Sequence, residues 1–321
     1  MKLKKIILII LVFLIVAGIV FVIFKNGNNK TKDLSKIQVV ASNFASYDFL
    51  RAIIGNDGEV ELTFLLGPGK DAHSYEPTPQ DLITIQNADL FVYIGGEMEK
   101  WADKVLESLD ANIKKICIAD SVDTIDEEEV DGAQEDEEEE EEEGAFDEHI
   151  WTSPSNAIKM INTLELAMEE INSKNINQYR QNAQNYIAKI VEVDNKISDI
   201  VNNRVRDRLI FADKMPMQYF INYYNLKVSA AFNGCSTETE PSAKTIAYLE
   251  SKIKEEKTPV VLYIELNPGL VAKTIANEVG NNVEAKQIQT IHNVSLDDFN
   301  RGETWVSLMT RNIDVLRKAL Q

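Results

Sequence analysis

Cysteine and basic residues are scarce in this chain, and each shortage argues against a class of protein. The 321 residues include only two cysteines, Cys117 and Cys235, which are far apart and form no Cys-x-x-Cys pair. This spacing supports neither a zinc knuckle nor a disulfide framework, so we expect two packed thiols. There are 33 basic residues against 52 acidic ones, for a net charge of −19. Nucleic acid is therefore not expected as a partner, because phosphate binding needs patches of lysine and arginine.

The amino terminus carries a basic start and one long apolar run. Three lysines precede the run from Ile6 to Phe24. As a helix this run is about 28 Å long, which is enough to cross a bilayer core of about 30 Å. No small-residue cleavage site follows it, so we expect an uncleaved anchor over residues 1–25 and a flexible tether over 26–36. The rest of the chain is then held at the cell membrane, on its extracytoplasmic side.

From residue 37 onward, short β-rich segments alternate with helical ones in two successive sets. This alternation predicts the α/β class, with parallel sheets covered by helices on both faces. The apolar fraction of 44% allows each set its own core. The expected strands are 37–40, 59–65, 90–94 and 115–118 in the first set, and 208–211, 227–231, 260–264 and 284–289 in the second. The expected helices are 46–55, 78–88, 98–111, 154–171, 176–201, 216–224, 242–256, 268–279 and 304–320.

One predicted helix, 176–201, stands between the two sets. Its apolar residues recur at alternating spacings of three and four, which places them on one narrow stripe. The helix would be roughly 38 Å long, about the width of a domain. We therefore expect two Rossmann-like lobes, 37–175 and 207–321, joined by one long linking helix within 176–206. The cleft between two such lobes is the usual place for a ligand.

An acidic segment interrupts the first set. Asp126 to Glu148 contains 16 acidic residues and no basic one, and without it the net charge would be −3. Because like charges repel and bury no core, we predict a disordered insertion. It is either a solvated loop or a weak collector of divalent cations for a nearby site.

The three histidines of the chain all fall on predicted loops. His73 lies in GPGKDAHSYEPTPQD, between a strand and a helix whose start is marked by Thr78 and Pro79. His149 precedes another helix start, and His292 follows the last strand, in TIHNVS. Loops at the carboxyl ends of parallel strands face the ligand cleft, and neutral imidazole suits zinc. No HExxH or other hydrolytic motif accompanies them.

Four segments of the chain carry a family resemblance: GPGKDAHSYEPTPQDLITIQNADLFVYIGGEMEKW, DEHIWTSPSNA, STETEPSAKTIAYLESKI and ETWVSLMTRNIDVLRKAL. Together they resemble the metal-binding solute receptors of zinc and manganese ABC importers that have a rigid linking helix. The resemblance covers nearly all of 37–321 and implies two α/β lobes that capture a divalent ion and deliver it to a permease.

Carried over residue by residue, the resemblance implies a set of metal ligands. His73 and His149 match the first two ligands of the family. His292 falls where many members have an aspartate, so it is a ligand of changed type. The candidate residues for orienting the imidazoles are Asp71, Glu76, Asp147 and Glu148.

The remaining family ligand should lie in FADKMPMQYF, which contains neither histidine nor glutamate. Asp213 is the available carboxylate there, although Lys214 would fill the same place without binding. Glu238 and Glu240 are further candidates, and a water molecule is another. Both carboxylates also have a purely structural explanation. Asp213 would then cap a helix, and Glu240 would brace the chain before the next helix.

We therefore expect a monomeric receptor that binds one Zn²⁺ between its lobes, performs no chemistry and delivers the ion to an ABC permease. Three imidazoles with at most one carboxylate favour zinc, and manganese or iron is the alternative cargo. Two other classes stay open: a secreted zinc hydrolase with an open coordination position, and a metal-binding surface interaction protein without a transport role.

Overall fold

The first sheet is built from four short strands that are all parallel. The computed structural model describes residues 35–134, 146–234, 240–280 and 282–321. The chain consists of two compact units, Met1–Lys36 and Ile37–Gln321. The described sheets and helices belong to the second unit. The strand order is β2-β1-β3-β4, with β1 and β3 buried in the middle. These strands are β1 (Ile37–Ala41), β2 (Val60–Phe64), β3 (Leu90–Tyr93) and β4 (Lys114–Cys117).

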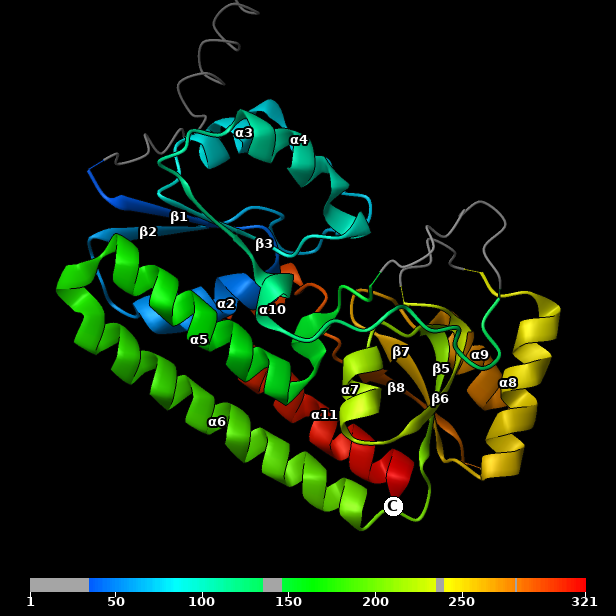
Figure 1. Ribbon diagram of the computed structural model, residues 1–321. Coiled ribbons are helices and arrows are strands. Elements are labelled where there is room, and N and C mark those ends of the chain that lie inside the picture. The colour runs from blue at the N-terminus through cyan, green and yellow to red at the C-terminus, as the bar shows by residue number, and fades with distance from the viewer. Residues whose placement is uncertain (1–34, 135–145, 235–239, 281) are drawn as a thin grey trace, which may run out of the picture. The chain divides into compact units, whose positions relative to one another are not determined.

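The second sheet repeats this arrangement, again with parallel pairing throughout (Figure 1). Its order is β6-β5-β7-β8, so in each sheet the chain starts on an inner strand, continues to the edge strand beside it and then crosses over to the other inner strand. Parallel strands need such crossovers, which explains why helices separate the strands in sequence. The strands are β5 (Arg208–Lys214), β6 (Lys227–Phe232), β7 (Val260–Ile264) and β8 (Glu284–Ile288).

Helices follow most strands, as the alternating pattern predicts. They are α2 (Phe44–Ile54), α3 (Pro79–Gln86), α4 (Lys100–Ser108), α5 (Pro154–Ile171), α6 (Ile176–Asn202), α7 (Gln218–Tyr223), α8 (Ala243–Glu256), α9 (Leu270–Val279), α10 (Leu296–Asn300) and α11 (Trp305–Leu320). The sequence pattern did not predict α10. With five residues, this helix is too short to show an amphipathic period, and it begins at a Ser295 cap that accepts from the backbone N–H of Asp298.

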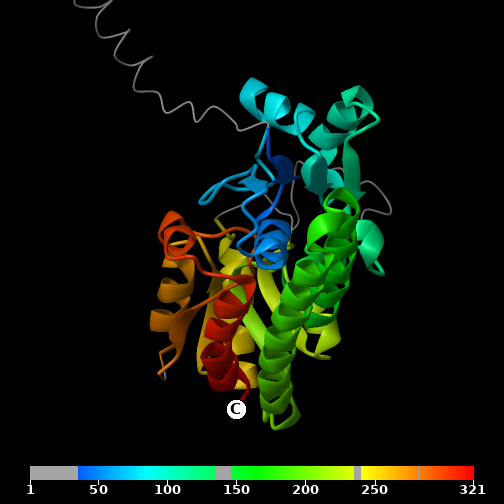
Figure 2. The ribbon, with the colours of Figure 1, turned by 90° about the vertical axis from the view of Figure 1, so that its left-hand side faces the viewer.

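Helix α6 has the predicted apolar stripe. Its buried residues recur every three or four positions from Tyr179 to Ile200. Its 27 residues correspond to about 40 Å, and the stripe packs against α2, α5 and α11. Figure 2 shows α6 and α11 side by side. A single cluster of buried residues runs through both sheets and α6, so the boundaries expected at residues 175 and 206 stay a prediction.

The beginning of the acidic segment is ordered, which differs from the predicted disordered insertion. Residues Asp126–Gln134, here called the strap, lie along β6, an edge strand. The carbonyl of Asp131 accepts from the N–H of Ala230, and the N–H of Gln134 donates to the carbonyl of Ala231. An edge strand presents unpaired backbone groups, and the strap supplies partners for them. The stretch 135–145 lies outside the described residues.

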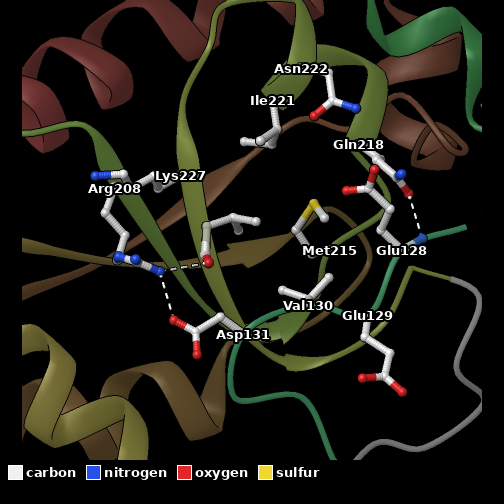
Figure 3. A pocket seen from close by; sticks show the side chains of 11 residues that line it. Glu128, Glu129, Val130, Asp131, Arg208, Met215, Gln218, Ile221, Asn222 and Lys227 are labelled. Atoms are coloured by element: carbon white, nitrogen blue, oxygen red, sulfur yellow. Dashed lines mark hydrogen bonds and ion pairs between the residues drawn. The ribbon is translucent and has the colours of Figure 1, made fainter.

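Side chains also fasten the strap to the second sheet. The carboxylate of Asp131 accepts from Arg208 at 2.8 Å and from Ser229 at 3.2 Å, and it bonds the hydroxyl of Tyr248. Figure 3 shows Asp131 facing Arg208, with Val130 beside them. Val130 is buried, so one apolar residue among the acidic ones gives the strap a hydrophobic contact.

The predicted membrane anchor, residues 1–25, lies outside the described residues. Among the residues that the structure does describe, no helix is long and apolar enough to span a membrane. Cys117 has a free thiol whose Sγ donates to the carbonyl of Ile94, as expected of a packed cysteine. Cys235 lies outside the described residues.

Asp48 offers a test of how the helices are held together. It is buried on α2, and its carboxylate accepts from Arg51 at 2.5 Å, from the N–H of Trp305 at 2.7 Å and from the hydroxyl of Tyr186. Three helices therefore share one carboxylate. We expect Asp48→Ala to lower the free energy of unfolding by about 3 kcal/mol, because the buried donors of Tyr186 and Trp305 and the partly buried guanidinium of Arg51 lose their acceptor.

Urea denaturation followed by circular dichroism measures this loss. Asp314→Ala is the matched control, because Asp314 is 89% exposed and forms an ion pair with Arg317, three residues later on the same helix. The control is expected to stay within about 0.5 kcal/mol of the unmodified chain. Equal effects of the two substitutions would contradict this account of the helix contacts.

Candidate metal centre

The His73 loop forms as its sequence predicts. The chain leaves β2 through Gly67 and Gly69, which both have positive φ. Thr78 and Asp81 form a capping box at the start of α3, with Pro79 at the first position. Between these fixed ends, the N–H of His73 donates to Oδ1 of Asp71 at 3.0 Å. The loop backbone is therefore held on both sides of the imidazole.

His149 is held more tightly than the other two histidines. Its side chain is fully buried, just before the short 3-10 turn Ile150–Thr152. Oδ1 of Asp147 lies 2.8 Å from the backbone N of His149 and 2.8 Å from its Nδ1. A proton on Nδ1 satisfies this carboxylate, which leaves the lone pair of Nε2 free to bind a cation.

The loop after β8 carries His292. Its backbone N–H donates to Oε1 of Glu265 at 2.9 Å. Glu265 directly follows β7, the strand beside β8 in the second sheet. His292 is thus placed by the neighbouring strand as well as by its own.

The three imidazoles converge on one point. A ring nitrogen of each lies within 4.8 Å of a ring nitrogen of both others. The ring centroids are 5.1 Å apart for His73 and His292, 5.4 Å for His149 and His292, and 5.8 Å for His73 and His149. Nitrogens bound to one zinc ion at about 2.0–2.1 Å lie at most about 4 Å apart, so small side-chain movements bring all three into range.

Nε2 is the atom that each histidine leaves without a partner. In the part of the chain that the structure describes, Nε2 of His73, His149 and His292 is buried and makes no hydrogen bond. One buried acceptor without a hydrogen bond lowers the stability of the folded chain by about 1–3 kcal/mol. Three of them at one point match the donor set of a site for a cation that prefers nitrogen ligands.

The pKa values of the histidines follow from burial and from their neighbours. Burial and the adjacent His149 lower the pKa of His73 to about 4. Burial, together with the two other rings, lowers the pKa of His292 well below its usual range. Burial also acts to lower the pKa of His149, but the charge and hydrogen bond of Asp147 outweigh it and raise the pKa above its ordinary value.

The two carboxylates considered as ligands lie apart from this cluster. Asp213 is buried at the end of β5, and its oxygens accept from the N–H groups of Ile264 at 3.0 Å and Lys214 at 2.9 Å. It therefore braces β5 against β7. Glu240 is exposed ahead of α8, and its carboxylate is not among the converging ligand atoms. Glu238 lies outside the described residues.

The segment Thr290–Val294 connects the three histidine loops. The carbonyl of Thr290 accepts from Nε1 of Trp151, two residues after His149, at 3.0 Å. Nδ2 of Asn293 donates to the carbonyl of Gly67 at 3.1 Å, and the carbonyl of Val294 accepts from the N–H of Gly69 at 2.8 Å. The loops of His73 and His149 are thus bonded to the loop that carries His292.

Sequence reasoning found some of these supporting residues and missed others. Asp147 was among the candidates for orienting an imidazole, and its Oδ1 lies 2.8 Å from Nδ1 of His149. Trp151 and Trp305 are buried in the core. Glu265 and Asn293 were missed. Their only sequence signal is a polar residue directly after a strand or beside a candidate histidine.

Comparison with known proteins then decides the family. A family model described as "Zinc-uptake complex component A periplasmic" matches residues 39–319. The chain belongs to this family. The resemblance carried by the histidine motifs is thereby confirmed.

Individual members of the family cover most of the chain. The present chain is 29% identical over 312 residues to the high-affinity zinc uptake system protein ZnuA of Bacillus subtilis (strain 168). This alignment covers 95% of the present chain and 96% of that protein. The chain is 28% identical over 295 residues to the zinc-binding protein AdcA of Streptococcus pyogenes serotype M3 (strain ATCC BAA-595 / MGAS315), covering 88% of this chain. This chain spans only 56% of that longer protein.

A solved structure of the family confirms the fold class. The Zn(II)-bound ZnuA-like domain of Streptococcus pneumoniae AdcA aligns with a TM-score of 0.73 at 26% identity. The alignment covers 89% of this chain and 99% of that domain. The α/β arrangement of two parallel sheets is therefore the arrangement of this family.

The Asp147–His149 pair gives a prediction about proton binding. We expect Asp147→Asn to lower the pKa of His149, because the substitution removes the negative charge that favours the imidazolium ion. Protonation of His149 should then begin only at a lower pH than in the unmodified chain. Histidine NMR titration of the metal-free chain measures the pKa directly.

Asp71→Asn is the control for this titration. Asp71 bonds the backbone of His73 and no ring nitrogen of His149, so the pKa of His149 is expected to stay unchanged. An unchanged pKa in Asp147→Asn would show that Asp147 does not set the protonation of His149.

Proposed function

We propose that this protein is the extracytoplasmic zinc receptor of an ABC importer, capturing one Zn²⁺ and delivering it to the permease. His73, His149 and His292 bind the ion through Nε2. The observation that carries this proposal is the convergence of three buried Nε2 atoms without hydrogen-bond partners. Membership of the zinc-uptake family supports the same conclusion.

The donor set is the reason for choosing zinc over manganese or iron. Three imidazoles suit zinc, whereas manganese is better served by carboxylate oxygens. The oxygens of Asp213 are already engaged by two backbone N–H groups, and Glu240 is exposed. We therefore assign neither as a direct ligand, and a water molecule completes a four-coordinate shell.

A transport role accounts for the site better than the two other classes do. A zinc hydrolase needs a general base beside the metal-bound water. Asp147, two residues before His149, instead accepts from the ring and backbone of that histidine. Glu148, directly before His149, accepts from the N–H of Met98 at 2.7 Å. A surface interaction protein would have no need of three imidazoles that bring buried Nε2 atoms to one point. We therefore propose that the protein is not an enzyme and acts as a monomer.

We also propose that the chain stays at the membrane through its amino-terminal apolar run. Ile6 to Phe24 is long enough to cross a bilayer core, and the three preceding lysines favour a cytoplasmic start. The tether 26–36 then leaves the receptor free to meet its permease outside the membrane.

Zinc titration against a competing chromophoric chelator tests the receptor function. The unmodified chain is expected to show one tight site. His73→Ala should weaken this site by at least about a hundredfold, more than the loss of an outer hydrogen-bond partner typically costs. The reason is that two imidazoles and water cannot replace the lost nitrogen.

Glu240→Ala is the control for this titration, and we expect unchanged affinity. Weak zinc binding at several sites, with no change in His73→Ala, would refute the histidine site. The acidic segment 126–148 would then be the main zinc binder.

Membrane extraction tests the anchor. The full chain is expected to stay in the membrane pellet after washing with alkaline carbonate, because an apolar helix is not released by charge disruption. A variant that starts at residue 36 should appear in the soluble fraction. Release of the full-length chain, or loss of its amino terminus in a mass spectrum, would disprove the anchor.

A further inference from the structure

Two bulky apolar residues have backbone conformations that their side chains disfavour. Leu266 has φ of 64° and Ile291 has φ of 62°. The other non-glycine residues with positive φ in the described part of the chain are Asn225, Lys257 and Asn282. Asparagine tolerates this region, and Lys257 ends α8, where left-handed residues are common. A β-branched residue such as Ile291 is a true outlier there, so something must hold it.

Glu265 lies next to both strained residues. It directly precedes Leu266, and its carboxylate bonds the residues on either side of Ile291. Oε2 accepts from the N–H of Thr290 at 2.7 Å, and Oε1 accepts from the N–H of His292 at 2.9 Å. Oε1 also accepts from Oγ1 of Thr290 at 2.8 Å. One carboxylate thus closes a ring around Ile291.

The left-handed conformation explains how both N–H groups reach the same carboxylate. Backbone N–H groups close together in the chain point to one side when a left-handed residue stands among them, and this concave arrangement binds anions. Here the anion is the side chain of Glu265, which is buried. With Ile291 in an ordinary extended conformation, the N–H groups of Thr290 and His292 would point to the same side but lie about 6.6 Å apart along the chain, too far for one carboxylate to accept from both.

The position of the His292 imidazole depends on this arrangement. His292 directly follows Ile291, so relaxation of φ at Ile291 would rotate the peptide that carries the imidazole. Ile291 is buried in the core, and the carbonyl of Thr290 is engaged by Trp151. The segment is therefore fixed on one side by core packing and on the other by Glu265.

We propose that Glu265 is a positioning residue for zinc capture: its carboxylate holds Ile291 left-handed and so keeps Nε2 of His292 directed at the other two imidazoles. This inference rests on the proposed function, since it assumes that the histidines bind zinc. Glu265 touches no ligand nitrogen itself. It acts through the backbone of the loop that carries His292.

Glu265→Gln in the full-length chain tests the role. A glutamine offers one acceptor oxygen in place of two and cannot accept all three hydrogen bonds. We expect zinc affinity to fall about 10–100-fold, the usual effect of losing a partner that orients a metal ligand. Visible absorption of the cobalt(II)-loaded chain should also change, because the coordination geometry changes.

A matched control and a second substitution separate positioning from general stability. Asp57→Asn removes another carboxylate that accepts several hydrogen bonds, from Tyr179, Asn172 and Asn175. It lies away from the histidine loops, so it should leave zinc affinity and the cobalt spectrum unchanged even where it lowers the melting temperature. Ile291→Gly removes the conformational strain, because glycine adopts positive φ freely.

The combination of substitutions gives the decisive comparison. In the Ile291→Gly background, Glu265→Gln should cost less than about threefold in zinc affinity, since the strained residue is gone. An equal loss in both backgrounds, or no loss in either, would overturn the proposal. Where Glu265→Gln does not fold, Glu265→Asp makes the same comparison, because the shorter side chain cannot span the ring.

The same titrations distinguish this inference from the proposed function. Failure of His73→Ala to weaken zinc binding would refute the zinc site as a whole. Loss of binding in His73→Ala with full affinity in Glu265→Gln would refute only the role of Glu265.

Discussion

The hydrogen bonds of the segment Thr290–Val294 are the constraint on which the site depends. This loop leaves the second sheet, yet it bonds the carbonyl of Gly67 and the N–H of Gly69 on the His73 loop, and Trp151 beside His149. Three histidines from distant parts of the sequence can form one site only if their loops keep a fixed relation. Here that relation is set by hydrogen bonds between the loops, while Nε2 of each histidine has no hydrogen-bond partner among the described residues and is available to the ion.

The elements of the fold could be predicted because their signals are local. Strands such as β7 are short apolar runs between turn residues, and α6 shows one apolar stripe over its length. The histidines were accessible to the same reasoning, since parallel strands end at one edge of a sheet and their loops gather there. Three histidines in a chain of 321 residues leave few alternatives to weigh.

The supporting contacts could not be predicted, because each joins residues far apart in sequence. Glu265 looks like an ordinary acidic residue after a strand, and only the folded chain brings Thr290 and His292 to its carboxylate. The same holds for Asp131, which stands in an acidic run and yet pairs with Arg208. The acidic composition of the run does not show which of its residues contacts the edge strand β6. The folded structure depends on that one contact. Asp213 shows the converse: its residue type suits a metal, but its oxygens are taken by backbone N–H groups.

The fastened ends of the acidic segment have a consequence for how this protein can vary. The strap pairs with β6 up to Gln134, and Phe146 forms a bridge with Asp126 where the chain returns. The described residues on both sides of 135–145 are thus held by hydrogen bonds to the second sheet and by this bridge. Substitutions at these ends, such as at Asp131, would therefore disturb the edge of the second sheet, whereas a separate set of hydrogen bonds holds the histidine loops together.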